Sequence, residues 1–262
     1  MSISFKEHHQ YQLNNNPNEI KSNIHNSGKF ATKFLYSMNQ IPPEDLTFIR
    51  DLGIGGCGKV YLAESKTLGK VAVKMTLLGG EDQFFQDFLN EAELLSRMNS
   101  PYIIRFFGTT RNTEGECIVM EYATNGTLFH FLELLRKRKI ETTFSWEKRY
   151  KMAQDIARGL LLMHSHGVFH RDMKSLKIFL ENDLTPKISD FGLSKIKTKN
   201  QITSSNFYVP NNVYGSLLWK TPETFSIKNP YTEKADINSL GKVFWEIASC
   251  QVPYGGFDAD IV

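Results

Sequence analysis

The chain has 262 residues, of which 41% are hydrophobic and 23% charged, a composition typical of a soluble globular protein with one large domain or two lobes. A formal net charge of +3 is too small to indicate nucleic acid or an anionic membrane as a partner. Three scattered cysteines fit neither a disulfide framework nor a zinc site, and no apolar run is long enough to span a membrane, so we expect a cytoplasmic protein.

Residues 1–43 form a polar segment that includes the asparagine-rich stretch 14–18 and shows little periodicity. Such a segment cannot bury enough apolar surface to fold, so we expect a disordered N-terminal tail. Order is expected to begin at residue 44, because Pro42 and Pro43 resist helix formation. The folded domain is therefore predicted over residues 44–262.

The first half of this domain carries strand signals, namely short runs of β-forming residues separated by turns. The predicted strands cover 46–52, 59–63, 71–75, 103–108 and 117–122. Between the third and fourth, apolar residues at helical spacing predict a helix over 81–98. The first three strands therefore indicate an antiparallel meander, and one helix and two further strands follow it.

The second half is predicted to be mostly helical, with helices over 127–138, 146–166 and 233–250. In the long central helix, one face is expected to hold Trp146, Tyr150, Ala153, Ala157, Leu160 and His164. Strands first and helices later indicate an α+β architecture of two lobes.

Glycines recur in the turn between the first two strands, at Gly53, Gly55 and Gly58, with Val60 following. A strand follows this turn rather than a helix, so the pattern does not predict a dinucleotide-binding fold. Two interpretations are left: a simple glycine-rich turn, or a hairpin whose bare backbone approaches phosphate groups closely.

Lys74 ends an apolar strand, where an ammonium group needs an anion nearby. Glu91 lies three residues after Phe88 and four before Leu95, so it is expected on the buried face of the first helix. A carboxylate on an apolar face calls for a cation. We therefore predict an ion pair between Lys74 and Glu91, with Lys74 also reaching a ligand phosphate.

Four further motifs follow in order: HRDMKSLKI at 170–178, DFG at 190–192, GSLLWKTPE at 215–223 and DINSLG at 236–241. With the glycine-rich turn and the lysine–glutamate pair, the chain from about residue 44 to its end resembles the eukaryotic protein kinases. It is most similar to the tyrosine-kinase-like group of serine/threonine kinases. The resemblance implies a two-lobed kinase fold, with an N-lobe over about 44–122 and a partial C-lobe over about 123–262.

The resemblance also implies roles for individual residues, with ATP and Mg²⁺ as cofactors. Asp172, Lys174 and Lys74 are expected to be catalytic, and Asp190 to bind the metal. The expected ATP-binding residues are Gly53, Gly55, Gly58, Val60, Ala72, Lys74, Glu91, Met120, Glu121, Ala123 and Phe179.

Lys174, two residues after the expected catalytic aspartate, matches the serine/threonine kinases, so a protein substrate with serine or threonine hydroxyls is expected. Arg171 beside Asp172 indicates control by phosphorylation. A phosphate on Thr203, Ser204 or Ser205, in the segment between Asp190 and Glu223, would pair with Arg171 and order that segment. The alternative is that these hydroxyls merely suit a polar loop.

The pattern breaks at Lys177, where the family carries an asparagine that offers an oxygen to a second Mg²⁺. Lysine has no acceptor, and its charge repels a metal. In one interpretation the ammonium replaces the electrostatic role of that metal, and a slow kinase results. In the other, the domain is a pseudokinase that binds nucleotide or scaffolds partners without catalysis. A third class, an interaction module indifferent to nucleotide, is also open.

Kinases of this family continue past the stretch Pro253-Tyr254-Gly255-Gly256 with further helices, whereas this chain ends at Val262. From the resemblance we therefore expect a C-terminally truncated domain whose second lobe is incomplete.

Overall fold

The computed structural model describes residues 37–55, 58–75, 82–112, 115–192, 194–196, 218–225 and 232–255. The chain divides into two units, Met1–Ser37 and Met38–Val262, and the second contains the sheet and the main helices. The predicted disordered tail, apart from its last residues, and the predicted phosphorylation sites Thr203, Ser204 and Ser205 lie outside the described residues.

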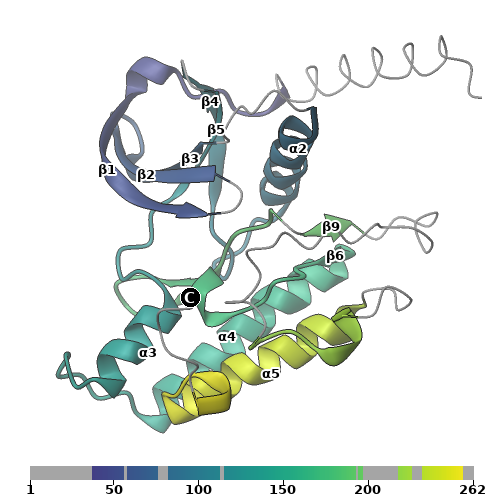
Figure 1. Ribbon diagram of the computed structural model, residues 1–262. Helices are drawn as coiled ribbons and strands as arrows, with labels where there is room; N and C mark the ends of the chain where they lie inside the picture. The colour runs from purple at the N-terminus through teal and green to yellow at the C-terminus, as the bar shows by residue number, and fades with distance from the viewer. Residues whose placement is uncertain are drawn as a thin grey trace, which may run out of the picture. The chain divides into compact units, whose positions relative to one another are not determined.

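A five-stranded antiparallel sheet forms the first half of the second unit, in the order β1-β2-β3-β5-β4 (Figure 1). The strands are β1 (Leu46–Gly55), β2 (Gly58–Ser65), β3 (Gly69–Met75), β4 (Phe106–Arg111) and β5 (Glu116–Glu121). Helix α2 (Asp82–Arg97) follows β3 and packs against β4. The predicted meander of the first three strands and the helix after it are therefore present, and β5 lies between β3 and β4.

The two faces of this sheet have different roles. One face packs a cluster of buried side chains that consists of Ile41, Leu46, Ala63, Val71, Val73, Met75, Cys117 and Val119. Val60 lies opposite Lys74 in the β2–β3 ladder, and Ala72 lies opposite Met120 in the β3–β5 ladder. Directly opposed residues share a face, and successive residues of a strand alternate. These four therefore lie together on the face opposite the buried cluster.

The fourth strand begins at Phe106, not at Ile103 as predicted. Ile103 instead forms an isolated bridge with Ile188, and the Ile104 N–H donates to the Ile188 carbonyl at 2.9 Å. These residues thus join the first half of the unit to the second. The strand extends to Arg111 because β5 supplies hydrogen-bonding partners beyond the apolar stretch.

The second half is mostly helical, with short strands between the helices. Its elements are α3 (Leu128–Arg136), α4 (Trp146–Ser165), β6 (Val168–Phe169), β7 (Ile178–Leu180), β8 (Pro186–Ile188), β9 (Lys195–Ile196) and α5 (Glu233–Ser249). The side chains of Thr127 and Ser145 cap α3 and α4 by accepting hydrogen bonds from backbone N–H groups. The predicted α+β class is confirmed. None of the described helices combines the length and apolar character needed to cross a membrane.

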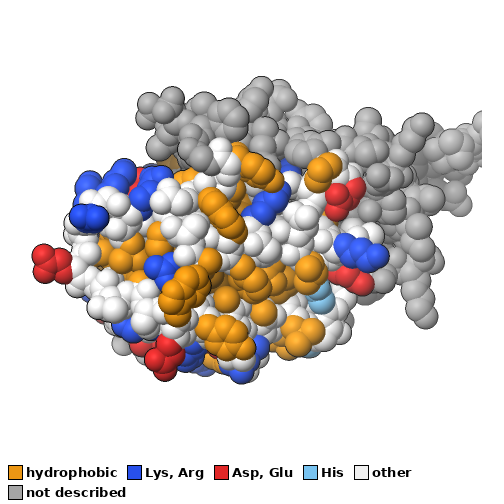
Figure 2. Space-filling view, turned by 90° about the horizontal axis from the view of Figure 1, so that it is seen from below, with side chains coloured by type: hydrophobic (Ala, Val, Ile, Leu, Met, Phe, Trp, Pro, Cys, Tyr) orange, Lys and Arg blue, Asp and Glu red, His pale blue; other side chains and the backbone are white. Residues whose placement is uncertain are grey.

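The predicted face of α4 is only partly covered: Leu160 is buried, but the two aromatic residues at its start are not. Trp146 and Tyr150 are 71% and 72% exposed, and the guanidinium of Arg149 stacks on the Trp146 ring. The buried residues of α4 are Met152, Asp155, Ile156, Gly159, Leu160 and Met163. A helical repeat fixes which residues share a face, but β8 and α5 decide which face is covered. Seen from below, the surface carries several groups of hydrophobic side chains (Figure 2).

Gly159 allows the closest approach in this packing. A Cβ atom at Gly159 would lie 2.9 Å from the Ile188 Cδ1 atom and 3.0 Å from the Tyr102 carbonyl oxygen. Both neighbours belong to the connection that joins the two halves of the unit, since the Ile188 N–H donates to the Tyr102 carbonyl. A side chain here would push α4 away from that connection.

The packed chain begins before the expected boundary at residue 44. Asn39 and Ile41 exchange backbone hydrogen bonds with Thr109 of β4, at 2.9 Å each. Ile41 is buried in the sheet cluster. Two prolines stop a helix, but they do not prevent an extended segment from pairing with the edge of a sheet.

Glu246 of α5 is a buried acid that joins two distant segments. Its Oε1 accepts a hydrogen bond from Ser175 Oγ and its Oε2 accepts one from Trp219 Nε1, each at 2.7 Å. Burial raises the pKa of Glu246 from 4.5 to about 7, although the two hydrogen bonds oppose the rise. The folded chain therefore holds a proton that the unfolded chain releases between these pH values.

We predict that the chain loses stability as the pH rises from about 4.5 to 7, because a group whose pKa is raised on folding stabilises the protonated state. The loss from Glu246 should be about 3 kcal/mol. In Glu246→Gln, which keeps a donor and an acceptor but does not titrate, this part of the pH dependence should disappear. Urea unfolding across this range measures it.

The exposed Glu141 provides a matched control, and Glu141→Gln should follow the parent curve. An equal pH dependence in Glu246→Gln and the parent would contradict the role given to this carboxyl.

Candidate functional site

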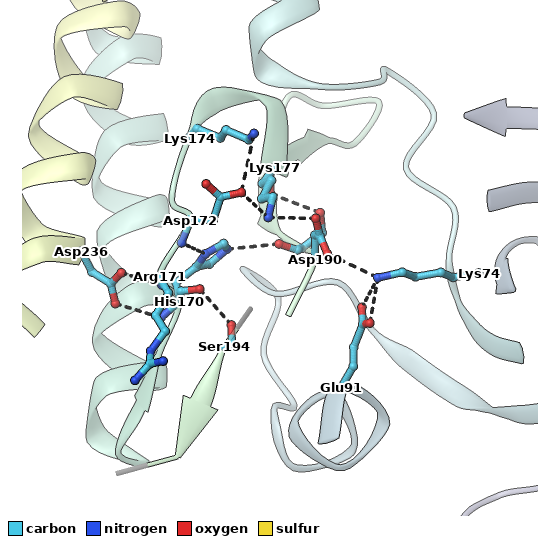
Figure 3. A network of polar contacts seen from close by, with 11 residues as sticks. Lys74, Glu91, His170, Arg171, Asp172, Lys174, Lys177, Asp190, Ser194 and Asp236 are labelled. Atoms are coloured by element: carbon cyan, nitrogen blue, oxygen red, sulfur yellow. Dashed lines mark hydrogen bonds and ion pairs between the residues drawn. The ribbon is translucent and has the colours of Figure 1, made fainter. Parts of the chain in front are cut away.

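The predicted site residues come from three segments far apart in the sequence that meet at one place (Figure 3). Lys74 lies on β3, Asp172 lies in the loop after β6, and Asp190 follows β8. Side chains from all three are linked by a continuous chain of ion pairs. The structure therefore brings together residues that the sequence motifs left separate.

The predicted ion pair between Lys74 and Glu91 is present. The Lys74 Nζ atom lies 2.6 Å and 2.7 Å from the two carboxylate oxygens of Glu91. The two side chains are only 9% and 6% exposed. Burial raises the pKa of the Glu91 carboxyl, and the Lys74 ammonium opposes that rise. This pair fixes Lys74 with its ammonium toward Asp190.

Asp190 receives an ammonium group at each oxygen. Its Oδ1 lies 3.3 Å from Lys74 Nζ and its Oδ2 lies 2.9 Å from Lys177 Nζ. Burial raises its pKa, but Lys177 and Lys74 outweigh burial and hold the pKa well below its usual value. Its backbone has a φ of 62°, in the left-handed region that non-glycine residues seldom adopt.

Lys177 lies between Asp172 and Asp190. Its Nζ is 2.6 Å from Asp172 Oδ2 and 2.9 Å from Asp190 Oδ2, and the side chain is 11% exposed. Burial lowers the pKa of Lys177, but the two carboxylates outweigh it and raise the pKa. The Lys177 carbonyl also accepts a hydrogen bond from the Ser189 N–H at 2.9 Å, which ties it to the residue before Asp190.

Asp172 has a second lysine neighbour. Lys174 Nζ lies 3.6 Å from Asp172 Oδ2. Burial raises the pKa of Asp172, but Lys177 and Lys174 outweigh it and lower the pKa. Burial lowers the pKa of Lys174. Asp172 is thus an ionised carboxylate, able to accept a proton from a hydroxyl placed beside it.

Asp236 of α5 positions this loop, a role that the sequence motifs did not assign. Its oxygens accept hydrogen bonds from the backbone N–H groups of His170 and Arg171, each at 2.9 Å. Its Oδ2 also lies 2.9 Å from His164 Nε2. Arg171 has a φ of 68°, and the two hydrogen bonds hold that conformation. Asp236 lies four residues before Leu240 and seven before Val243, so it shares the buried face of α5 with them. A charged residue on that face could have predicted this role from the sequence.

The predicted ATP-binding residues of the first half fall on one side of the sheet. Val60, Ala72 and Met120 share a face with Lys74, as the strand registers require. Gly53 and Gly55 of β1 pair with Val60 and Gly58 of β2. Gly58 has a φ of 134°, which a residue with a side chain rarely adopts, so the turn depends on glycine there.

The remaining predicted ATP-binding residues lie at the junction of the two halves. Ala123 is buried after β5, and Phe179 is half-buried in β7, bridged to Thr127. The Glu121 side chain pairs with Lys187 at 2.8 Å. Its backbone N–H donates to the Arg105 carbonyl at 2.9 Å. The ATP-binding role of these residues stays a prediction.

The donor set fits one Mg²⁺ and not two. Within the described ranges, no group of three or more His, Cys, Asp or Glu side chains is arranged to hold a metal. Mg²⁺ is commonly held by one or two carboxylates together with substrate phosphates, and the partly exposed Asp190 can supply such a carboxylate. Lys177 offers only donors where a second metal ligand is expected.

Comparison with known proteins agrees with this geometry. The family model of the protein kinase domain matches residues 46–261. A probable serine/threonine-protein kinase of Dictyostelium discoideum is 34% identical over 226 residues, covering 85% of this chain and 9% of that protein. The probable serine/threonine-protein kinase drkC of the same organism is 34% identical over 230 residues, covering 86% and 29%. The serine/threonine-protein kinase CTR1 of Arabidopsis thaliana is 32% identical over 224 residues, covering 83% and 26%.

The chain spans less than a third of the length of each of these three relatives. The similarity therefore covers only part of each relative.

We predict that Lys177→Met lowers the free energy of unfolding by about 3 kcal/mol, because Asp172 and Asp190 lose the cation between them. Urea denaturation at neutral pH measures the change. Lys137→Met, which removes an exposed pair with Glu133, should cost only about 0.5 kcal/mol. Equal losses in the two variants would show that Lys177 has no special structural role.

Proposed function

The chain belongs to the protein kinase domain family, and from this premise we propose that it transfers the γ-phosphate of ATP to serine or threonine hydroxyls of a protein. Its similarity to named serine/threonine-protein kinases supports the substrate class. One observation carries the proposal: Lys74, Asp172 and Asp190 converge through a chain of ion pairs at a single site.

In the proposed reaction, Asp172 orients the substrate hydroxyl and accepts its proton. The hydroxyl oxygen forms a bond to the γ-phosphorus, and the bond from that phosphorus to the oxygen bridging to the β-phosphate breaks. ADP leaves with the electron pair of that bond. Lys174, 3.6 Å from Asp172, is placed to stabilise the negative charge on the transferring group.

Lys74, fixed by Glu91, would bind the α- and β-phosphates. The glycine hairpin would cover the phosphates, and the shared face of Val60, Ala72 and Met120 would hold the adenine. Asp190 would hold one Mg²⁺ together with the phosphates, and that ion supplies charge neutralisation when bound.

Lys177 lowers the expected rate. A single positive charge stands where a divalent ion is expected, and loss of one preorganised electrostatic contact commonly costs about 10²–10³ in rate. The proposed enzyme is therefore a slow kinase.

A second candidate function is a nucleotide-binding pseudokinase that scaffolds other proteins. The pairing of Lys177 with both Asp172 and Asp190 favours it, because a carboxylate that already holds an ammonium at 2.6 Å is less available to a hydroxyl proton. The two functions share the nucleotide site and differ in phosphoryl transfer.

Regulation is proposed to act through Arg171. A phosphate on Thr203, Ser204 or Ser205 would pair with the guanidinium beside the catalytic loop and order the segment before Glu223. We propose that the domain consists of an N-lobe over about 44–122 and a partial C-lobe over about 123–262. We also propose that the protein acts in the cytoplasm.

We predict that the parent chain transfers labelled phosphate from ATP to a protein substrate, and that Asp172→Ala lowers the rate by about 10² or more. Acid hydrolysis of the product should release phosphoserine or phosphothreonine. Asp183→Ala, an exposed aspartate in the turn after β7, should keep the parent rate.

Lys177→Asn separates the two candidate functions. A parent without transfer, whose Lys177→Asn variant gains it, would establish the pseudokinase and overturn the proposed activity. Transfer by the parent that survives in Asp172→Ala would show that the activity comes from a contaminant.

A further inference from the structure

Lys177 gives the site a cation that belongs to the chain itself. The ammonium lies within 2.9 Å of both Asp172 and Asp190, the two acidic residues that come from different segments of the second half. Its side chain is largely buried, and the turn Ser175–Lys177 fixes its backbone. The charge is therefore permanently present in the site.

The charges around this point balance. Three ammonium groups and three carboxylates are joined by the ion pairs of the site: Lys74, Lys174 and Lys177 with Glu91, Asp172 and Asp190. With a neutral residue at position 177, the same set would carry an excess negative charge. Such a site would repel the phosphates of a nucleotide unless a metal ion neutralised them.

Displacing Lys177 to admit a second metal would be costly. Mg²⁺ dehydrates reluctantly and needs oxygen ligands at close range. Both oxygens of Asp190 already face ammonium groups, and one oxygen of Asp172 faces two. Breaking the pairs at 2.6 Å and 2.9 Å would also leave a largely buried ammonium without partners.

We propose that Lys177 acts as a tethered replacement for a divalent cation, so that the chain binds nucleoside triphosphate without any divalent metal. This inference rests on the proposed nucleotide site and deepens it. A metal bound through Asp190 then serves phosphoryl transfer, and binding does not require it. In this chain, nucleotide binding is thus independent of a metal ion, whereas phosphoryl transfer depends on one.

The test is calorimetric titration of the full chain with ATP, once in EDTA and once in excess Mg²⁺. The two dissociation constants of the parent should agree within about threefold. For Lys177→Asn, the dissociation constant measured in EDTA should be larger than the one measured in Mg²⁺ by about tenfold or more, because one cation near the phosphates is lost.

Lys139→Asn is the matched control, because it removes an exposed lysine just beyond α3 and changes the net charge equally. It should behave as the parent does. Thermal unfolding of each variant confirms that it is folded, and the parent titration can overturn the inference even where a variant does not fold.

The outcomes distinguish this inference from the proposed function. Parent binding that is lost in EDTA but present in Mg²⁺ would overturn the tethered-cation role and leave the kinase function standing. A parent that binds no ATP in either condition would overturn the proposed function and this inference together. Similar dissociation constants for the parent in EDTA and in Mg²⁺, together with strong metal dependence of binding in Lys177→Asn, would establish the tethered-cation role of Lys177.

Discussion

The site depends on one ammonium group, that of Lys177, which lies between two carboxylates. Asp172 and Asp190 lie close enough to share Lys177, and without a cation their mutual repulsion would work against the fold. A metal ion can provide that cation, but a lysine provides it within the covalent chain. Stability and the proposed nucleotide chemistry are therefore linked at the same side chain.

The helical half supports this arrangement through buried acids of α5. Asp236 holds the backbone of His170 and Arg171, and Glu246 holds Ser175 of the same loop. The loop thus receives anchors on both sides of Asp172. Burying a polar group costs free energy unless it is hydrogen-bonded. The hydrogen bonds from the loop to Asp236 and Glu246 therefore favour one conformation of the loop over all others.

The sheet supplies the other side of the site. Alternation along β3 places Val71 and Val73 in the apolar cluster and Lys74 on the opposite face, beside Glu91 of α2. The same alternation separates the residues that stabilise the sheet from those proposed to meet the nucleotide. A change on one face therefore need not disturb the other.

The sequence alone determined the type and order of the main elements and the Lys74–Glu91 pair, because these follow from local periodicity and from the need of a buried carboxylate for a cation. The motif residues followed from the resemblance to the protein kinases. It did not determine the covered face of α4, where Trp146 and Tyr150 are exposed, because that depends on which neighbours pack there. Nor did it determine the partners of Lys177. A lysine side chain is long and flexible, and only the folded positions of two segments decided where its charge lies.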